Sequence, residues 1–197
     1  MRTILHVLGI DNEDKDENYF RMFTFLFIQF VMVSINLFAG FVTNSMSLTA
    51  CVGYHLTNLF VIGNDVAKNI FLDTKAARIG RIVVVIFGSV MALVFSAILI
   101  NEFFVRLYSP VYFSDPFVWT MLITSMVSTI KSFIYGFCSR KVLKETVVSL
   151  TVFVSMILMK ILDIQTIDSY VGLGVSLFVV FLSIKMIVRV WNHRKTF

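Results

Sequence analysis

The chain has 197 residues, of which 58% are hydrophobic and 15% are charged, with a formal net charge of +5 and a mean hydropathy of +0.87. A soluble domain is typically about 45–50% apolar and about 25% charged, whereas here the apolar residues form runs of about twenty, the length that crosses a bilayer. These values exclude a water-soluble enzyme, a nucleic-acid-binding protein and a disordered chain.

Residues 1–18 are predicted to form a cytoplasmic tail rather than a secretory signal. A short apolar patch is followed by a run of charged residues between Asp11 and Glu17, so no long apolar stretch leads to a cleavage site. The tail is therefore expected to remain in the solvent on the cytoplasmic side.

Residues 19–191 are predicted to form six transmembrane helices, because about 20 helical residues cross the ~30 Å hydrocarbon core of a membrane. In chain order the expected spans are residues 19–41, 45–68, 82–108, 117–138, 141–162 and 168–191. The connections are short, so successive helices are expected to be antiparallel neighbours. Residues 192–197 are predicted to be a short cytoplasmic tail, with no C-terminal soluble domain.

The positions of the basic residues predict the orientation. With six spans, the N-terminal tail, the second and fourth links and the C-terminal end all share one face of the membrane. Of the 17 lysines and arginines, only Arg106 and Lys160 fall on the opposite face. The positive-inside rule therefore predicts a multi-pass protein of the cell membrane with both termini in the cytoplasm.

Polar residues recur at helical spacing in four of the six spans, the first, second, fourth and fifth. They are Gln29 and Asn36; Cys51, Tyr54, His55, Asn58 and Asp65; Thr120, Thr124, Ser128, Lys131 and Ser132; and Lys141, Glu145, Ser149 and Ser155. An ionisable group that faces lipid costs at least ~2.5 kcal/mol. These four spans are therefore predicted to surround a polar interior.

The third and sixth spans carry small residues instead. Gly88, Ala92 and Ser96 lie at four-residue intervals in the third span, and Gly172, Gly174 and Ser176 lie close together in the sixth. Small residues allow helix backbones to approach each other closely in lipid. The two spans are therefore predicted to pack together.

Several segments resemble one family of membrane proteins. The third span ends in Glu102-Phe-Phe-Val-Arg106-Leu-Tyr-Ser-Pro110, which resembles the E-x-x-x-R-L-x-x-P segment of the cation diffusion facilitators, six-span exporters of zinc and similar divalent metals. The sixth span begins Asp168-Ser-Tyr-Val-Gly-Leu-Gly-Val-Ser and resembles the family's D-P-I-x-x-L-x-x-S. The segment Asn44-Ser-Met-Ser-Leu-Thr-Ala is similar to its G-S-x-A-L-x-A, and Gly80-Arg81 resembles the start of its third span.

This resemblance implies a fold and an activity. The fold would be an all-α bundle of six transmembrane helices, and the activity would be efflux of a divalent cation by proton antiport. In that family the metal is held between spans two and five by H-x-x-x-D or D-x-x-x-D pairs, whose members lie one helical turn apart. Two such pairs supply four ligands in the tetrahedral arrangement that zinc prefers. The expected partners are the lipid bilayer, the divalent cation, protons and a second copy of the chain in a homodimer, and no cofactor is expected.

The implied metal ligands fall on unusual residue types in this chain. The pair in span two falls on Tyr54 and Asn58, and the pair in span five falls on Lys141 and Glu145. Only Glu145 is a good metal ligand, but a shift of one residue places His55 beside the site. The predicted metal-binding residues are therefore Tyr54, His55, Asn58 and Glu145.

Because Lys141 occupies a position of the implied metal site, three hypotheses about the function of the protein remain open. In the first, His55 and Glu145 bind a cation in competition with protons, because an imidazole ordinarily changes its protonation between pH 5 and 8. In the second, Lys141 and Glu145 form an internal ion pair that replaces the metal, and the protein is a non-transporting relative that acts through assembly with itself or a partner. In the third, Lys141 binds an anionic substrate.

An enzyme is not predicted, because the sequence has no HExxH motif and no nucleophile elbow. The two cysteines, Cys51 and Cys138, lie in or beside apolar runs without a CxxC spacing. They are predicted to be buried thiols.

Overall fold

A computed structural model describes residues 15–70, 75–136 and 140–192. Within these ranges the side-chain surroundings of residues 15–22, 65, 68–70, 75–78, 135–136 and 140–144, which include Asp65 and Lys141, lie outside the description. The helices are α2 (Lys15–Thr43), α3 (Met46–Ile70), α4 (Lys75–Tyr108), α5 (Asp115–Gly136), α6 (Arg140–Leu162) and α7 (Thr166–Asn192). In the described residues, six helices are long and apolar enough to cross a membrane. The predicted all-helical fold with six candidate spans is confirmed.

Two of the helices begin earlier than the hydropathy predicts. Helix α2 begins at Lys15, inside the segment expected to be a tail, and α4 begins at Lys75 rather than at residue 82. Acidic residues follow Lys15 and alanines follow Lys75. Acidic residues near a helix N-terminus and alanines within a helix both favour helix formation, so the helices extend beyond their apolar parts.

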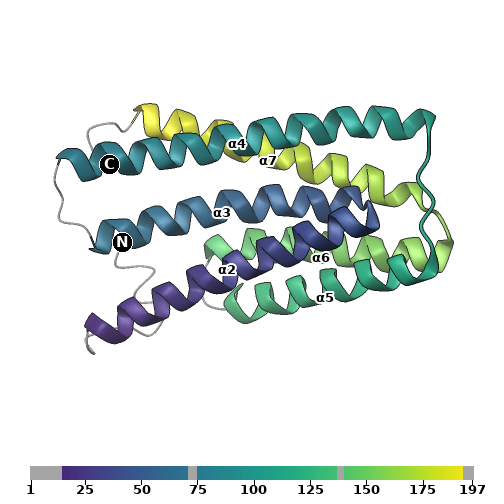
Figure 1. Cartoon of the computed structure of the whole chain (residues 1–197), viewed down its shortest axis with the longest axis horizontal. Coiled ribbons are helices and arrows are strands. Elements are labelled where there is room, and N and C mark those ends of the chain that lie inside the picture. Colours follow the sequence, from purple (N-terminus) through teal and green to yellow (C-terminus); the bar gives the residue numbers. More distant parts are fainter. Residues whose placement is uncertain (1–14, 71–74, 137–139, 193–197) are drawn as a thin grey trace.

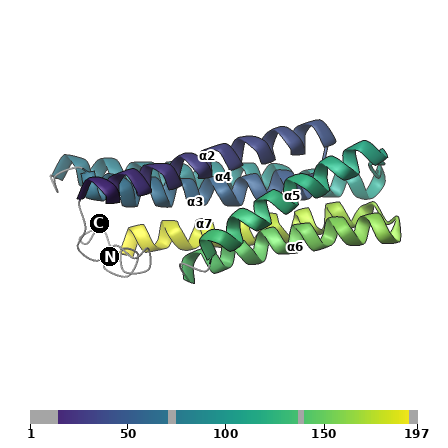
Figure 2. The same cartoon turned by 90° about the horizontal axis from the view of Figure 1, so that it is seen from below.

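Successive helices run antiparallel, so α2 begins and α7 ends at the same end of the bundle (Figure 1). Seen from below, α2, α3 and α4 form one layer and α6 and α7 form a second (Figure 2). Helix α5 runs obliquely from the first layer toward the second (Figure 2). With six antiparallel helices, both ends of the described chain lie at the same end of the bundle, and their cytoplasmic location stays a prediction.

The helices differ in how extensively they pack. The pair α4 and α7 has the most extensive contact, which confirms that the third and sixth spans pack together. Helix α3 packs on α2, α4 and α7, whereas α5 and α6 form a hairpin whose contacts with the other helices are smaller. The polar interior lies where this hairpin meets α2 and α3.

Two glycines of α4 and α7 lie against α3. A Cβ atom added at Gly88 would overlap the ring of Phe60 in α3. One added at Gly172 would lie 2.6 Å from the Met46 side chain and 2.9 Å from its backbone carbonyl carbon. Both glycines therefore allow close contact with α3, which the prediction of an α4–α7 pair did not include.

Replacing Gly172 by alanine is expected to destabilise the bundle by about 1–3 kcal/mol, the usual cost of overpacking. The new methyl group would meet the Met46 backbone, which cannot turn aside as a side chain can. The matched control is Gly174→Ala, because a Cβ at Gly174 has no heavy atom within 4 Å, and alanine is the better helix former. The free energy of unfolding of both variants can be measured in mixed micelles. Equal values for the two would contradict the close contact between Gly172 and Met46.

The turn between α2 and α3 is stabilised by its own backbone hydrogen bonds and by hydrogen bonds from Arg106 of α4. Asn44 adopts a left-handed conformation with φ of 54°, and the amide of Ser45 donates to the carbonyl of Gly40 at 3.0 Å. This pattern is a Schellman motif, which pairs carbonyls at the C-terminus of a helix. The Arg106 guanidinium also donates to the Asn44 carbonyl oxygen at 3.0 Å and to its side-chain oxygen at 2.9 Å.

Asp168 at the start of α7 caps the N-terminus of α3. Its fully buried carboxylate accepts hydrogen bonds from the Ser45 hydroxyl at 2.7 Å, the Met46 amide at 2.7 Å and the Ser47 hydroxyl at 2.5 Å. Arg106 lies 3.7 Å away and is paired at 2.9 Å with Glu102, one turn back on α4. The start of α3, the end of α4 and the start of α7 are therefore joined by residues of the segments that resemble the cation diffusion facilitators, namely Asn44, Glu102, Arg106 and Asp168.

Candidate functional site

Four polar side chains from four helices meet inside the bundle. Gln29 comes from α2, His55 from α3, Lys131 from α5 and Glu145 from α6, and each is no more than 7% exposed. We call this group the central cluster. It confirms that the second and fifth spans turn polar residues toward each other, and that the first and fourth contribute to the same interior.

The Lys131 ammonium holds the cluster together. It forms an ion pair with Oε1 of Glu145 and donates a hydrogen bond to Oε1 of Gln29. Both charged groups are buried, and burying a charge is costly unless it is paired and hydrogen-bonded. The opposite charges of Lys131 and Glu145 therefore compensate each other in this interior.

His55 is the second partner of the carboxylate. Its Nδ1 lies 3.2 Å from Oε1 of Glu145 and 3.4 Å from Nε2 of Gln29. A proton on Nδ1 allows the shorter, charge-assisted hydrogen bond to Glu145, which is the stronger of the two. Nε2 of His55 is buried without a hydrogen-bond partner among the described residues.

The predicted metal-binding residues are brought together only in part. Asn58 donates to Oε2 of Glu145 at 3.4 Å, so Asn58, His55 and Glu145 meet as predicted. The ring of Tyr54 stacks on Phe178 of α7, with ring centroids 6.1 Å apart, and its side chain is hydrogen-bonded to Asn58. Tyr54 is therefore joined to Glu145 through Asn58, whereas His55 contacts the carboxylate directly.

The metal-ligating residue types are sparse in this interior. Within the described ranges, no group of three or more histidine, cysteine, aspartate or glutamate side chains could hold a metal ion. Cys51 is a buried free thiol, as predicted, and Cys138 lies outside the described residues. A cation at Glu145 would have to use the amide oxygens of Gln29 or Asn58 as well.

Lys131 and Gln29 belong to the cluster but were not predicted as site residues. Both appear in the polar stripes, yet Lys131 was counted among the basic residues of the cytoplasmic face. The structure places it 7% exposed inside the bundle, which corrects that count. The signal was present in the sequence: Lys131 is followed by apolar residues through Phe137, apart from Ser132 and Tyr135, and so lies within the span.

The predicted ion pair between Lys141 and Glu145 stays a prediction, because the side chain of Lys141 lies outside the description. The structure assigns the carboxylate a different lysine, Lys131, on the neighbouring helix. Glu145 therefore takes part in an internal ion pair, and the partner that the structure describes comes from α5.

Additional hydrogen bonds connect the helices around the cluster. Nδ2 of Asn36 in α2 donates to Oγ of Ser128 in α5 at 3.0 Å. The hydroxyls of Ser132 and Ser149 lie 3.2 Å apart between α5 and α6, and the Thr146 hydroxyl donates to the Ser132 carbonyl at 2.9 Å. These bonds fix α5 and α6 so that Lys131 and Glu145 face each other.

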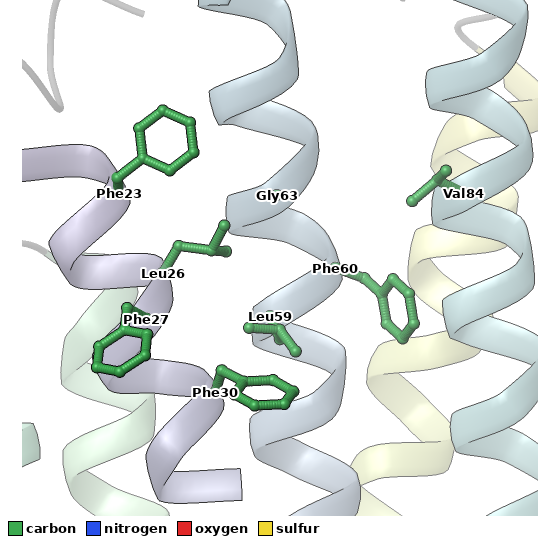
Figure 3. Close-up of a pocket in the computed structure, with 8 residues that line it drawn as sticks. All are labelled: Phe23, Leu26, Phe27, Phe30, Leu59, Phe60, Gly63 and Val84. Atoms are coloured by element: carbon green, nitrogen blue, oxygen red, sulfur yellow. The ribbon is translucent and has the colours of Figure 1, made fainter. Parts of the chain in front are cut away.

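A crevice of about 430 Å³ between α2, α3 and α4 has a different character (Figure 3). All its lining residues are apolar: Phe23, Leu26, Phe27, Phe30, Leu59, Phe60, Gly63 and Val84. Phe27 and Phe30 are more than half exposed. The crevice offers no ligand for a cation, and the central cluster is therefore the candidate site.

No known family model matches this chain, and no curated protein matches it. The family resemblance accordingly rests on the short segments described above.

Proposed function

We propose that this protein is a multi-pass transporter of the cell membrane, with both termini in the cytoplasm, that exchanges a divalent cation such as zinc for protons at Glu145. The observation that carries this proposal is the buried Glu145 carboxylate, shared by Lys131 and His55 within the six-helix bundle. Ionisable groups within membrane spans are costly, and they typically mark ion or proton pathways.

The chemistry of the cluster supports this function. A carboxylate, an imidazole and amide oxygens are ligands for divalent cations, and the imidazole and the amine both accept protons. A cation and a proton therefore compete for the same groups, which is the basis of antiport. Helices α4 and α7 pack on each other, and the polar groups of the cluster come from the other four helices.

The test is zinc uptake into liposomes that contain the purified protein. With an outward-directed proton gradient, the wild type is expected to take up Zn²⁺ and to release protons, both reported by trapped dyes. Glu145→Gln is expected to lower the Zn²⁺ flux at least about tenfold, since it removes the anionic ligand, whereas Glu145→Asp should retain part of it.

The matched control is Asp115→Asn, because the Asp115 side chain is 79% exposed at the opposite end of α5 and pairs with Lys160. Its flux is expected to equal that of the wild type. Wild-type flux equal to that of empty liposomes for Zn²⁺ and Mn²⁺ would reject the transport proposal.

A second candidate function is favoured by the ion pair itself. Because Lys131 already neutralises Glu145, a non-transporting relative would need no metal to stabilise this fold. Such a protein would act through assembly, as a homodimer or with a competent transporter, through surfaces within the membrane. Absence of flux from folded wild-type protein would favour this function.

A further inference from the structure

The apolar crevice between α2, α3 and α4 lies within the membrane-spanning part of the bundle. Its lining residues belong to the candidate spans Phe23–Thr43, Met46–Asn64 and Ile79–Tyr108. They come from the first half of α2, the second half of α3 and the first half of α4, which lie toward the same end of the bundle (Figure 1). The crevice therefore lies in the half of the bilayer nearer the first residues of α2.

The lining of the crevice is suited to an acyl chain and not to water. All the lining residues are apolar, and a buried water needs about two to four polar partners. The volume of about 430 Å³ falls within the range of small-molecule sites, about 300–1,000 Å³. Leu26 lies between α2 and α3 and Phe60 between α3 and α4 (Figure 3), whereas Phe27 and Phe30 are 66% and 57% exposed. Because exposed side chains within a span contact lipid, a chain can enter from the bilayer.

The charges beside the crevice favour an anionic headgroup. The segment Asp65–Arg81, which extends from the end of α3 into α4, contains four basic and two acidic residues. Three of the basic residues, Lys75, Arg78 and Arg81, lie in the first seven residues of α4, whose first turn has no acidic residue. Arg81 lies one turn before Val84, which lines the crevice, so the two residues share a face of α4. The basic start of α4 therefore adjoins the crevice.

We propose that the crevice binds one anionic phospholipid, with an acyl chain among the apolar side chains and the phosphate beside the basic start of α4. Long basic side chains near the ends of spans reach the level of the headgroups, and basic residues at the membrane surface attract anionic lipids. The lipid would contact α2, α3 and α4, which the crevice separates, and no residue of the central cluster. The proposal therefore holds or fails independently of cation transport.

The test is photo-crosslinking of the purified protein in nanodiscs of phosphatidylcholine. Two probes carry the same diazirine in the middle of an acyl chain, one on anionic phosphatidylglycerol and one on zwitterionic phosphatidylcholine. Mass spectrometry of peptides compares the crevice with Leu177, a 52% exposed residue near the middle of α7. The labelling ratio of the anionic to the zwitterionic probe is expected to be at least about fivefold higher at the crevice. High salt should reduce this preference.

Gly63→Leu fills the crevice. Gly63 lines it, and a Cβ added there would meet only the Leu26 side chain, at 4.0 Å, so leucine can extend into the space. Leucine is also the better helix former, and the bundle should remain folded. Labelling of the crevice by both probes is expected to fall at least about fivefold, with labelling at Leu177 unchanged. The matched control is Gly174→Leu, which lies outside the crevice in open space and should be labelled as the wild type is.

Lys75→Gln/Arg78→Gln tests the headgroup separately from the acyl chain. This variant should keep the labelling of the crevice but lose the preference for the anionic probe. An equal ratio of the two probes at the crevice and at Leu177 in the wild type, or an unchanged preference in this variant, would overturn the anionic lipid. Weaker labelling of the crevice than of Leu177 by both probes would mean that another occupant, such as a second copy of the chain, covers it, and would also overturn the proposal.

Discussion

Glu145→Gln is expected to lower the free energy of unfolding within the membrane by about 3 kcal/mol. The substitution leaves the Lys131 ammonium buried without its counter-ion, and only the amide oxygens of Gln29 and of the introduced glutamine would remain to receive it. Lys131→Met should be similarly destabilising, because the carboxylate would keep only His55 and Asn58 as partners.

The double variant distinguishes an ion pair from two independent contributions. Lys131→Met/Glu145→Gln buries no charge at this position, and replacing a whole buried pair is often neutral or stabilising. We expect it to be more stable than either single variant, as measured by steric trapping in bicelles. Additive losses in the double variant would show that the two side chains do not interact in the folded protein.

Asp168→Ala is expected to destabilise the bundle by about 3–5 kcal/mol, the range measured when one partner of a buried ion pair is removed. The carboxylate accepts hydrogen bonds from two backbone amides and two hydroxyls at the start of α3 and lies near Arg106. Without it, these amides would lack their buried acceptor, and the Arg106 guanidinium would lose a negative charge 3.7 Å away. Asp168→Asn should lose less stability than Asp168→Ala, since one side-chain oxygen remains as an acceptor.

Thermal unfolding followed by circular dichroism in the same detergent measures the effect at Asp168. Asp115→Asn is the matched control, because Asp115 also lies at a helix N-terminus but is exposed, where ion pairs contribute less than about 1 kcal/mol. A loss at Asp168 no larger than the loss at Asp115 would contradict the capping role.

The fold could be predicted from the sequence to a large extent because each span has to satisfy a strong physical constraint. Apolar runs of bilayer length fix the number of helices, and the stripes that contain Gln29, His55, Lys131 and Glu145 show which faces avoid lipid. The association of α4 with α7 was predicted from their small residues, but the close neighbours of Gly88 and Gly172 belong to α3. These contacts could not be predicted, since a small residue permits close contact on any side.

The site could be predicted only in part, for two physical reasons. The rotation of a helix about its axis decides which of two adjacent residues faces the interior, and in α3 it directs His55 to Glu145 while Tyr54 packs on Phe178. The pairing of Lys131 with Glu145 depends on how α5 lies against α6. A count of basic residues treats every lysine near the end of a span as exposed, so it missed a lysine paired inside the bundle.

The most direct measurement is the distance between the Lys131 nitrogen and the Glu145 carboxyl carbon in lipid, from the ¹⁵N–¹³C dipolar coupling in solid-state NMR. Glu145→Gln and Lys131→Met assign the signals. Without metal, a strong coupling is expected, corresponding to an ion pair within hydrogen-bonding distance, and saturation with Zn²⁺ should abolish it. Absence of the coupling in the metal-free protein would show that Lys131 and Glu145 do not form the buried ion pair on which the proposed function rests.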